Sequence, residues 1–118
     1  MIDLGFRTVE RGGGDAVVEC DVTAATANAL GTLHGGVIAT LVDEAGTEAI
    51  RSTDRDGRRG VTTDLNVSYF AAAPVGTTVR AEARTLKIGK TLAFVEVDLR
   101  GEGGKLLAQG RMTKYMPA

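Results

Sequence analysis

The order of apolar and polar positions along the chain predicts two strands, one helix and four further strands. In residues 91–100, Ala93, Val95, Val97 and Leu99 alternate with a mixed set of neighbours, which is the two-residue period of a strand with one apolar face. Comparable runs predict the full set of strands, over residues 6–10, 16–22, 61–71, 77–88, 91–100 and 105–115. The turns between successive strands are short, so these strands are expected to pair in antiparallel fashion.

The middle of the chain has a helical period instead, from His34 to Arg51. At 100° per residue, one apolar stripe contains Val37, Ile38, Leu41, Val42, Ala45 and Ala49. We expect this stripe to face the sheet. The opposite side is expected to carry small residues and one carboxylate: Gly36, Ala39, Asp43, Gly46 and Thr47. Small residues would let a ligand or another backbone approach Asp43 closely.

These elements predict an α+β fold in a single domain, residues 1–118, with an antiparallel sheet of about five to six strands wrapped around one long central helix. One helix covers only one face of such a sheet, so pairing into dimers is expected to protect the rest. The chain has no tryptophan and five other aromatic residues. Additional burial in an oligomer would suit a core built mainly from Val, Leu, Ile and Ala.

Composition and charge argue against several classes of function. The 14 Lys and Arg residues balance 15 Asp and Glu residues, whereas nucleic-acid-binding domains usually carry a net basic face. The N-terminus lacks the pattern of a signal peptide, and no run reaches the roughly 20 apolar residues that span a bilayer. The single cysteine, Cys20, forms no internal disulfide and fits a reducing compartment. We therefore expect a cytoplasmic protein without a nucleic-acid or membrane partner.

Residues 28–43 hold the groups with the clearest chemistry. Gly35 and Gly36 open the helix, where backbone N–H groups lack acceptors and no side chain blocks approach. Such an end attracts developing negative charge, so the Gly35 N–H is the predicted oxyanion donor, with Asn28 as a second polar group. Asp43 lies about 12 to 14 Å further along the helix axis. If the Gly35 N–H and the Asp43 carboxylate act on one carbonyl group, the carboxylate must come from a neighbouring subunit.

The same residues also have structural interpretations. Asp43, like Glu44 and Glu48, could be a solvated helix residue, and His34 could be a hydrogen-bonding residue at the helix start. Metal catalysis is disfavoured because His34 is the only histidine and no Cys or His cluster surrounds it. Five cations could be solubilising charges or could hold ligand phosphates: Arg58, Arg59, Lys87, Lys90 and Lys114. Spacing alone therefore leaves the function open.

Four blocks of sequence resemble one enzyme family. Residues 30–36 (LGTLHGG), followed by residues 39–43 (ATLVD), are similar to the His-Gly-Gly signature of hotdog-fold acyl-CoA thioesterases. The resemblance is strongest to the phenylacetyl-CoA (PaaI-type) branch, which includes mammalian thioesterase-superfamily acyl-CoA thioesterases. It continues through residues 60–66, 87–94 and 107–114. It implies a hotdog fold, paired into dimers and commonly tetramers, with the active site at the dimer interface.

The resemblance implies a role for each motif residue. Asp43 takes the place of the catalytic carboxylate, as a general base on water or as a nucleophile. The Gly35 N–H takes the oxyanion-hole position, Asn28 the place of an asparagine that orients the thioester, and His34 supports this geometry. Thr62 stands where close relatives carry a serine that positions the water, and it retains the hydroxyl.

The resemblance also implies a segment that contacts coenzyme A, which is part of the substrate, so no separate cofactor and no metal is expected. The implied contact residues are Lys87, Ile88, Gly89, Lys90, Thr91, Leu92 and Tyr69. Lysine ammonium and backbone groups would hold the phosphates there. Tyr115 stands where similar sequences carry histidine.

The resulting hypothesis is an enzyme that hydrolyses an aryl- or medium- to long-chain acyl-CoA to the free acid and CoA. One alternative is a non-catalytic acyl-CoA-binding protein. The other is an enoyl-CoA hydratase or dehydratase, which would require a catalytic histidine working with the carboxylate. Here the only histidine lies in the Gly-Gly turn, nine residues before Asp43. A carrier-protein thioester is a further possible substrate, although Lys87 and Lys90 favour CoA.

Overall fold

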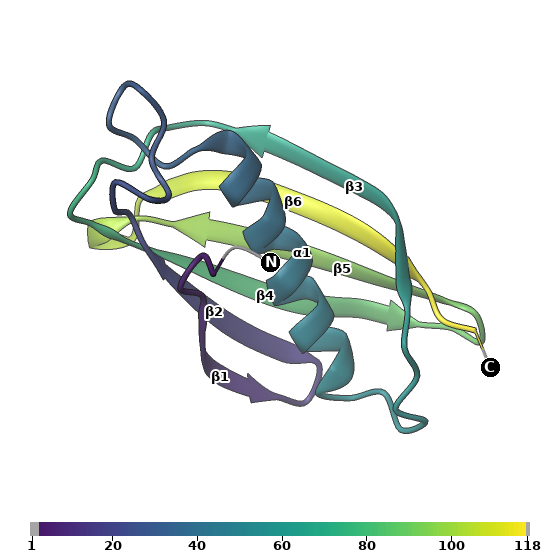
Figure 1. The fold of residues 1–118 in the computed structure, drawn as a ribbon. Helices are drawn as coiled ribbons and strands as arrows, with labels where there is room; N and C mark the ends of the chain where they lie inside the picture. Colours follow the sequence, from purple (N-terminus) through teal and green to yellow (C-terminus); the bar gives the residue numbers. More distant parts are fainter. Residues whose placement is uncertain (1–2, 118) are drawn as a thin grey trace.

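The computed structural model describes residues 3–117, which form one long helix and six strands in the predicted order (Figure 1). The elements are β1 (Arg7–Gly12), β2 (Asp15–Asp21), α1 (Gly35–Arg51), β3 (Val61–Tyr69), β4 (Thr78–Ile88), β5 (Leu92–Arg100) and β6 (Leu106–Tyr115). A short 3-10 turn at Glu102–Gly104, which the periodicity did not predict, joins β5 to β6.

All six strands belong to one antiparallel sheet with the order β1-β2-β4-β5-β6-β3. The chain leaves β2 through α1 and enters the far edge of the sheet as β3, and β4 then returns to pair with β2. Figure 1 shows α1 lying across one face of the sheet, which curves around it. The predicted α+β fold with a central helix is confirmed.

The first hairpin turns on two glycines. Gly13 and Gly14 have φ values of 61° and 94°, a left-handed conformation that matches the twist of a two-residue hairpin. Gly12 therefore still pairs with Asp15. The predicted five-residue turn at residues 11–15 is shorter in the structure, and β1 is correspondingly longer.

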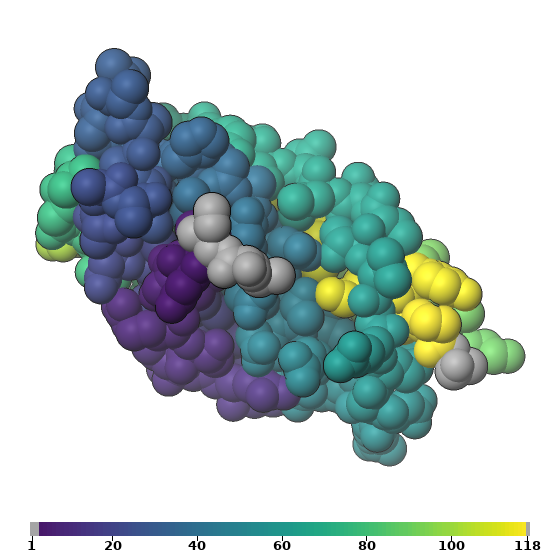
Figure 2. Space-filling model, viewed as in Figure 1, coloured from purple at the N-terminus to yellow at the C-terminus, as the bar shows by residue number. Residues whose placement is uncertain are grey.

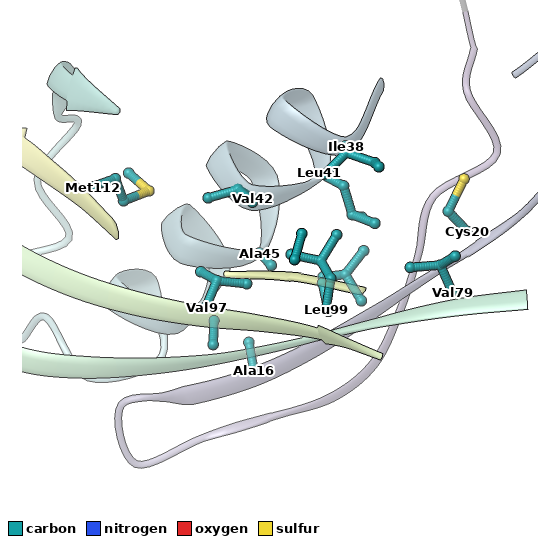
Figure 3. Close-up of a cluster of buried hydrophobic side chains, with 14 of the residues drawn as sticks. Ala16, Cys20, Ile38, Leu41, Val42, Ala45, Val79, Val97, Leu99 and Met112 are labelled. Carbon is teal, nitrogen blue, oxygen red and sulfur yellow. The ribbon is translucent and has the colours of Figure 1, made fainter. Parts of the chain in front are cut away.

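The core lies between α1 and the concave face of the sheet (Figure 3). The predicted helix stripe is buried at Ile38, Leu41, Val42, Ala45 and Ala49, with Val37 at its margin. The inward residues of β5 are likewise buried at Ala93, Val95, Val97 and Leu99. Cys20 is also fully buried, as expected of a small core residue, and burial raises the pKa of its thiol.

Gly46 is an exception to the predicted helix faces. It is buried and points at β5 and β6, where an added Cβ would collide with Met112 and meet Val95 Cγ1 at 3.4 Å. The expectation that Gly46 lies on the open side of the helix is therefore wrong. The missing side chain lets α1 approach the sheet closely.

The loop after α1 is held by an internal ion pair. Arg58 Nη2 lies 3.1 Å from Asp54 Oδ1, and the two side chains are only 11% and 5% exposed. Arg58 Nη1 also donates to the backbone carbonyls of Lys90 and Met116, at 2.6 and 3.3 Å. Arg58 is thus a structural cation that ties this loop to the β4–β5 turn, and the interpretation of Arg58 as a solubilising charge is wrong.

Close packing at Gly110 generates a stability prediction. An added Cβ at Gly110 would lie 2.6 Å from Val42 Cγ1 and 2.9 Å from Val42 Cγ2, and a buried valine has little rotamer freedom with which to move away. Gly110→Ala should lower the free energy of unfolding by about 1–3 kcal/mol. Gly12→Ala is the control, because its Cβ would meet nothing within 4 Å. Equal urea midpoints for the two variants would contradict this account of the packing.

The Asp54–Arg58 pair generates a pH-dependent prediction. Hydrogen bonds from Arg58 hold the pKa of Asp54 below its usual range. The stabilisation is therefore complete above the unfolded-state pKa of about 4 and is lost as the pH falls from there towards the folded-state pKa. Asp54→Asn should lower the free energy of unfolding by about 1.5–3 kcal/mol at pH 7, and this difference should shrink below about pH 4.

Asp56→Asn is the matched control for that experiment, since the Asp56 side chain is 76% exposed. It should change the free energy of unfolding by less than about 0.5 kcal/mol. Denaturant unfolding of the three proteins between pH 3 and 7 measures both effects. A difference between wild type and Asp54→Asn that stays constant over this range would refute the role given to the ionised carboxylate.

Candidate active site

His34 caps the N-terminus of α1. Its backbone is extended (φ −63°, ψ 135°), and its Nδ1 accepts the Gly36 N–H at 2.9 Å. Its carbonyl accepts from Val37 and Ile38 at 2.9 and 3.1 Å. An accepting Nδ1 places the proton of the neutral imidazole on Nε2. His34 therefore supplies acceptors for the N–H groups of Gly36, Val37 and Ile38, and the residue itself is exposed.

The Gly35 N–H differs from its neighbours in the first turn. Within residues 3–117 it has no hydrogen-bond acceptor, while the N–H groups of Gly36, Val37 and Ile38 are all bonded to His34. Tyr69 packs beside it: the hydroxyl donates to the Gly35 carbonyl at 2.7 Å, and the ring lies 3.7 Å from where a Cβ would be. This N–H is free to donate, at the partly positive end of a helix.

Asn28 is fixed by the loop that precedes the helix. Its Oδ1 accepts from the Leu30 N–H at 3.0 Å and from the Thr32 N–H and hydroxyl, both at 3.2 Å. Its own N–H donates to the Thr32 carbonyl at 2.8 Å. Three donors around Oδ1 define the orientation of the amide. The Nδ2 group, which has no acceptor among the described residues, stays available as a donor.

Asp43 lies on the side of α1 that faces β3. The Thr62 hydroxyl donates to Asp43 Oδ1 at 2.7 Å, a charge-assisted bond between helix and edge strand. Both residues are partly exposed, whereas Glu44 beside them is fully on the surface. Asp43 Oδ2 has no bonded partner within the part of the chain that the structure describes. One carboxylate oxygen is thus anchored and the other is open to a proton or a carbonyl carbon.

The predicted site residues fall into three separate groups within one chain. Asn28, His34, Gly35 and Tyr69 gather at the start of α1, while Asp43 and Thr62 meet more than two helical turns further on. Eight residues separate Gly35 from Asp43, about 12 Å of helix. The third group, residues 87–92, forms the β4–β5 turn at the opposite end of the molecule from the helix start (Figure 1). One chain does not bring the three groups together.

The β4–β5 turn is fastened by backbone contacts. The Gly89 N–H donates to the Leu92 carbonyl and the Met116 N–H to the Thr91 carbonyl, at 2.7 and 2.6 Å. An open depression of about 440 Å³ adjoins the turn and is lined in part by Arg55, Lys87 and Ile88. Tyr69 lies far from this turn along the sheet, beside the helix start. Tyr115 pairs in register with Leu92 and is partly exposed.

Lys114 lies on β6, the strand next to β3. It is buried at 8% exposure, and its Nζ donates to the Thr47 hydroxyl at 2.7 Å. The interpretation of Lys114 as a solubilising charge is therefore wrong. A signal was present, because Lys114 lies two residues from each of the buried Met112 and Met116, and the two-residue period of a strand places all three on the same face.

Neither a metal-binding cluster nor a membrane-spanning helix is found in the described residues. Across 3–117, no group of three or more His, Cys, Asp and Glu side chains is arranged to hold a metal ion. In the same part of the chain, α1 is not long and apolar enough to cross a membrane.

Known proteins resemble this chain in sequence and in fold. Acyl-coenzyme A thioesterase 13 of Homo sapiens is 47% identical over 104 residues, which cover 87% of this chain and 74% of that protein. The crystal structure of zebra fish thioesterase superfamily member 2 superimposes with a TM-score of 0.90 at 43% identity, covering 95% of this chain and 81% of that one.

A bacterial structure extends the likeness. The PaaI protein from the phenylacetic acid degradation operon of E. coli superimposes with a TM-score of 0.87 at 26% identity, and covers 95% of this chain and 83% of that one. The hotdog fold and the predicted family are thereby confirmed. The family model described as Thioesterase superfamily matches residues 30–108, and the chain belongs to this superfamily.

Proposed function

We propose that the chain hydrolyses acyl-CoA thioesters to a free acid and coenzyme A. The observation that carries this proposal is the free Gly35 N–H at the start of α1, a donor with no competing acceptor among residues 3–117. The identity of 47% with acyl-coenzyme A thioesterase 13 supports the same reaction class. A protein that only binds acyl-CoA would need neither this donor nor a half-anchored carboxylate.

The proposed reaction uses both ends of the site. The Gly35 N–H holds the thioester carbonyl oxygen as it becomes an oxyanion, and the Asn28 amide supplies a second donor. Asp43 Oδ2 removes a proton from water, whose oxygen attacks the carbonyl carbon, and the C–S bond then breaks to release the CoA thiolate, which takes up the proton. Direct attack by Asp43 on the carbonyl is the alternative route. Thr62 holds the other carboxylate oxygen in either case.

A second copy of the chain would bring the donor group at Gly35 and the carboxylate group at Asp43 together. Seven of the nine residues of β3 are exposed, and this strand forms one edge of the sheet. Antiparallel pairing of two β3 strands about their midpoint would set Thr62 of one chain close to Tyr69 of the other. Because Thr62 holds Asp43 and Tyr69 holds Gly35, this pairing brings the base of one chain towards the donor of its partner. We therefore propose a homodimer, with two such dimers forming a tetramer.

The β4–β5 turn is the proposed contact for coenzyme A. Lys87 and Lys90 are exposed ammonium groups on a turn whose backbone is fixed by Arg58, and ammonium groups bind phosphate as point charges. Tyr69, at the start of the helix, is better placed to contact the thioester end of the substrate than the phosphates. The acyl group that we propose is an aryl group or a medium to long chain.

The proposed base generates a direct test. Asp43→Asn should lower kcat at least about 10²-fold, since general base catalysis contributes 10² to 10⁴. Glu44→Gln, at the exposed neighbouring position, should keep wild-type activity. Free-thiol release from aryl-acetyl, hydroxybenzoyl, short-, medium- and long-chain acyl-CoA measures this and also ranks the acyl groups. A folded Asp43→Asn variant with near-full activity would remove Asp43 from the mechanism.

A site shared between chains predicts complementation. Gly35→Pro removes the oxyanion donor, and proline is tolerated at the first position of a helix. Alone, this variant should be as inactive as Asp43→Asn. After the two are unfolded together and refolded, half of the dimers are mixed and one of their two sites is intact, so about a quarter of wild-type activity should return. Mixtures that stay inactive despite mixed dimers in native mass spectrometry would place the whole site within one chain.

A further inference from the structure

One buried cation has no part in the reaction described above. The Lys114 ammonium on β6 donates to the Thr47 hydroxyl and makes no ion pair within 4.0 Å to any carboxylate of residues 3–117. A buried charge of this kind is costly unless it is paired. Of the three N–H donors of the ammonium, two remain for another acceptor.

Lys114 lies next to the proposed base. Thr47 is one helical turn after Asp43 on α1, and Lys114 is the β6 residue adjacent to Thr62 in the pairing of β3 with β6. Two parallel links therefore join helix and sheet: Asp43 to Thr62, and Thr47 to Lys114. One turn is about 5.4 Å, so the residue that binds the ammonium lies one turn along the helix from Asp43.

A cavity opens at this ammonium, which we call the Lys114 cavity. Its volume is about 280 Å³, and its lining includes Thr47, Ile50, Gly60, Lys114 and Met116. Gly60 makes room for the lysine, because an added Cβ would lie 2.6 Å from Lys114 Cγ and 2.8 Å from Cε. Figure 2 shows yellow atoms of the C-terminal segment between the atoms of α1 and those of β3, so this region is reached from the surface.

The charge of the Lys114 cavity is positive. Arg59 and Arg51 stand at its rim, and Arg58, which also lines it, is already neutralised by Asp54. Arg51 is partly balanced by Glu48 at 3.8 Å. The Lys114 ammonium is the innermost of these charges, and it acts in a partly dry environment where a charge-assisted bond is strong.

We propose that the Lys114 cavity is an anion-accepting subsite of the thioester site, in which Lys114 binds a carboxylate or phosphate oxygen of the substrate. This inference rests on the proposed function. The anion has two possible sources, a carboxylate at the far end of the acyl group or a phosphate of coenzyme A. Ile50 and Met116 would contact the methylene groups that lead to it.

Three thioesters separate the two sources. Hexanoyl-CoA carries the phosphates alone, adipoyl-CoA adds a distal carboxylate, and hexanoyl-pantetheine lacks both. Two ratios of kcat/KM are compared: adipoyl-CoA to hexanoyl-CoA, and hexanoyl-CoA to hexanoyl-pantetheine. Lys114→Met should lower at least one of these ratios about tenfold or more, as expected for loss of a charge-assisted hydrogen bond. A fall in the ratio of adipoyl-CoA to hexanoyl-CoA identifies the acyl carboxylate as the anion that Lys114 binds. A fall in the ratio of hexanoyl-CoA to hexanoyl-pantetheine identifies a phosphate of coenzyme A.

Lys105→Met is the matched control, because it removes the same charge from an exposed residue and should leave both ratios as in wild type. Lys114→Met should fold with an equal or higher Tm, since removal of a buried unpaired charge is neutral or stabilising. Lys114→Gln, which retains a polar contact with Thr47, gives the same comparison if the methionine variant is unstable. Both ratios within twofold of wild type would overturn the proposal, even if overall activity falls.

Failure of the proposed function has a different signature, namely no hydrolysis of any thioester by wild type. The thioesters then bind without being cleaved, so calorimetry can measure the Kd of each. The same two comparisons between thioesters are then made with Kd values in place of kcat/KM. A tenfold change in either ratio would still support the anion-accepting subsite. Unchanged Kd ratios would overturn it independently of catalysis.

Discussion

Burial of one face of α1 against the sheet fixes the position of every candidate site residue. Leu41, Val42, Ala45 and Ala49 are fully buried, and this sets the rotation of the helix about its axis. With 3.6 residues per turn, Asp43 and Thr47 must then face β3 and β6. Gly46 and Gly110 allow the close approach, because side chains there would collide with Met112 and Val42. Core packing therefore sets the direction in which the Asp43 carboxylate points, and the polar contacts add to it.

The polar contacts add what apolar packing does not supply. α1 packs mainly against β2 and β4 and makes few contacts with β3, which is held from the helix side by hydrogen bonds of Thr62 and Tyr69. Hydrogen bonds are directional, so they fix the Asp43 carboxylate and the first turn of the helix with an accuracy that dispersion forces lack. The less tightly packed side of the helix is consequently where donors and acceptors are accessible to a substrate.

Periodicity predicted every strand and the helix within a few residues. The helix and strands β2, β4, β5 and β6 each have a buried face, whereas the exposed strands β1 and β3 were marked mainly by the turns and loops that bound them. His34 and Gly35 also lie at the start of the helix and Asp43 two turns into it, as predicted, and Asn28 lies in the loop before it. The position of β3 beside β6 was not predictable in this way, since strand order depends on contacts distant in sequence. Arg58 and Lys114 were misjudged because charged residues are usually exposed, and their burial is explained only by the partners Asp54 and Thr47, which the hydrophobic pattern does not reveal.

The rigidity of α1 also explains why assembly and activity would be coupled. Side-chain motion cannot close the roughly 12 Å between the Gly35 N–H and Asp43, because both belong to one continuous helix. Edge strand β3 contacts both ends of this helix segment, through Thr62 and Tyr69, and its outer edge has no strand partner among residues 3–117. If this edge pairs in antiparallel fashion with β3 of a second copy, the two-fold symmetry would place Thr62 of each chain near Tyr69 of the other. The strand that would complete the sheet is thus the same strand that would complete the site.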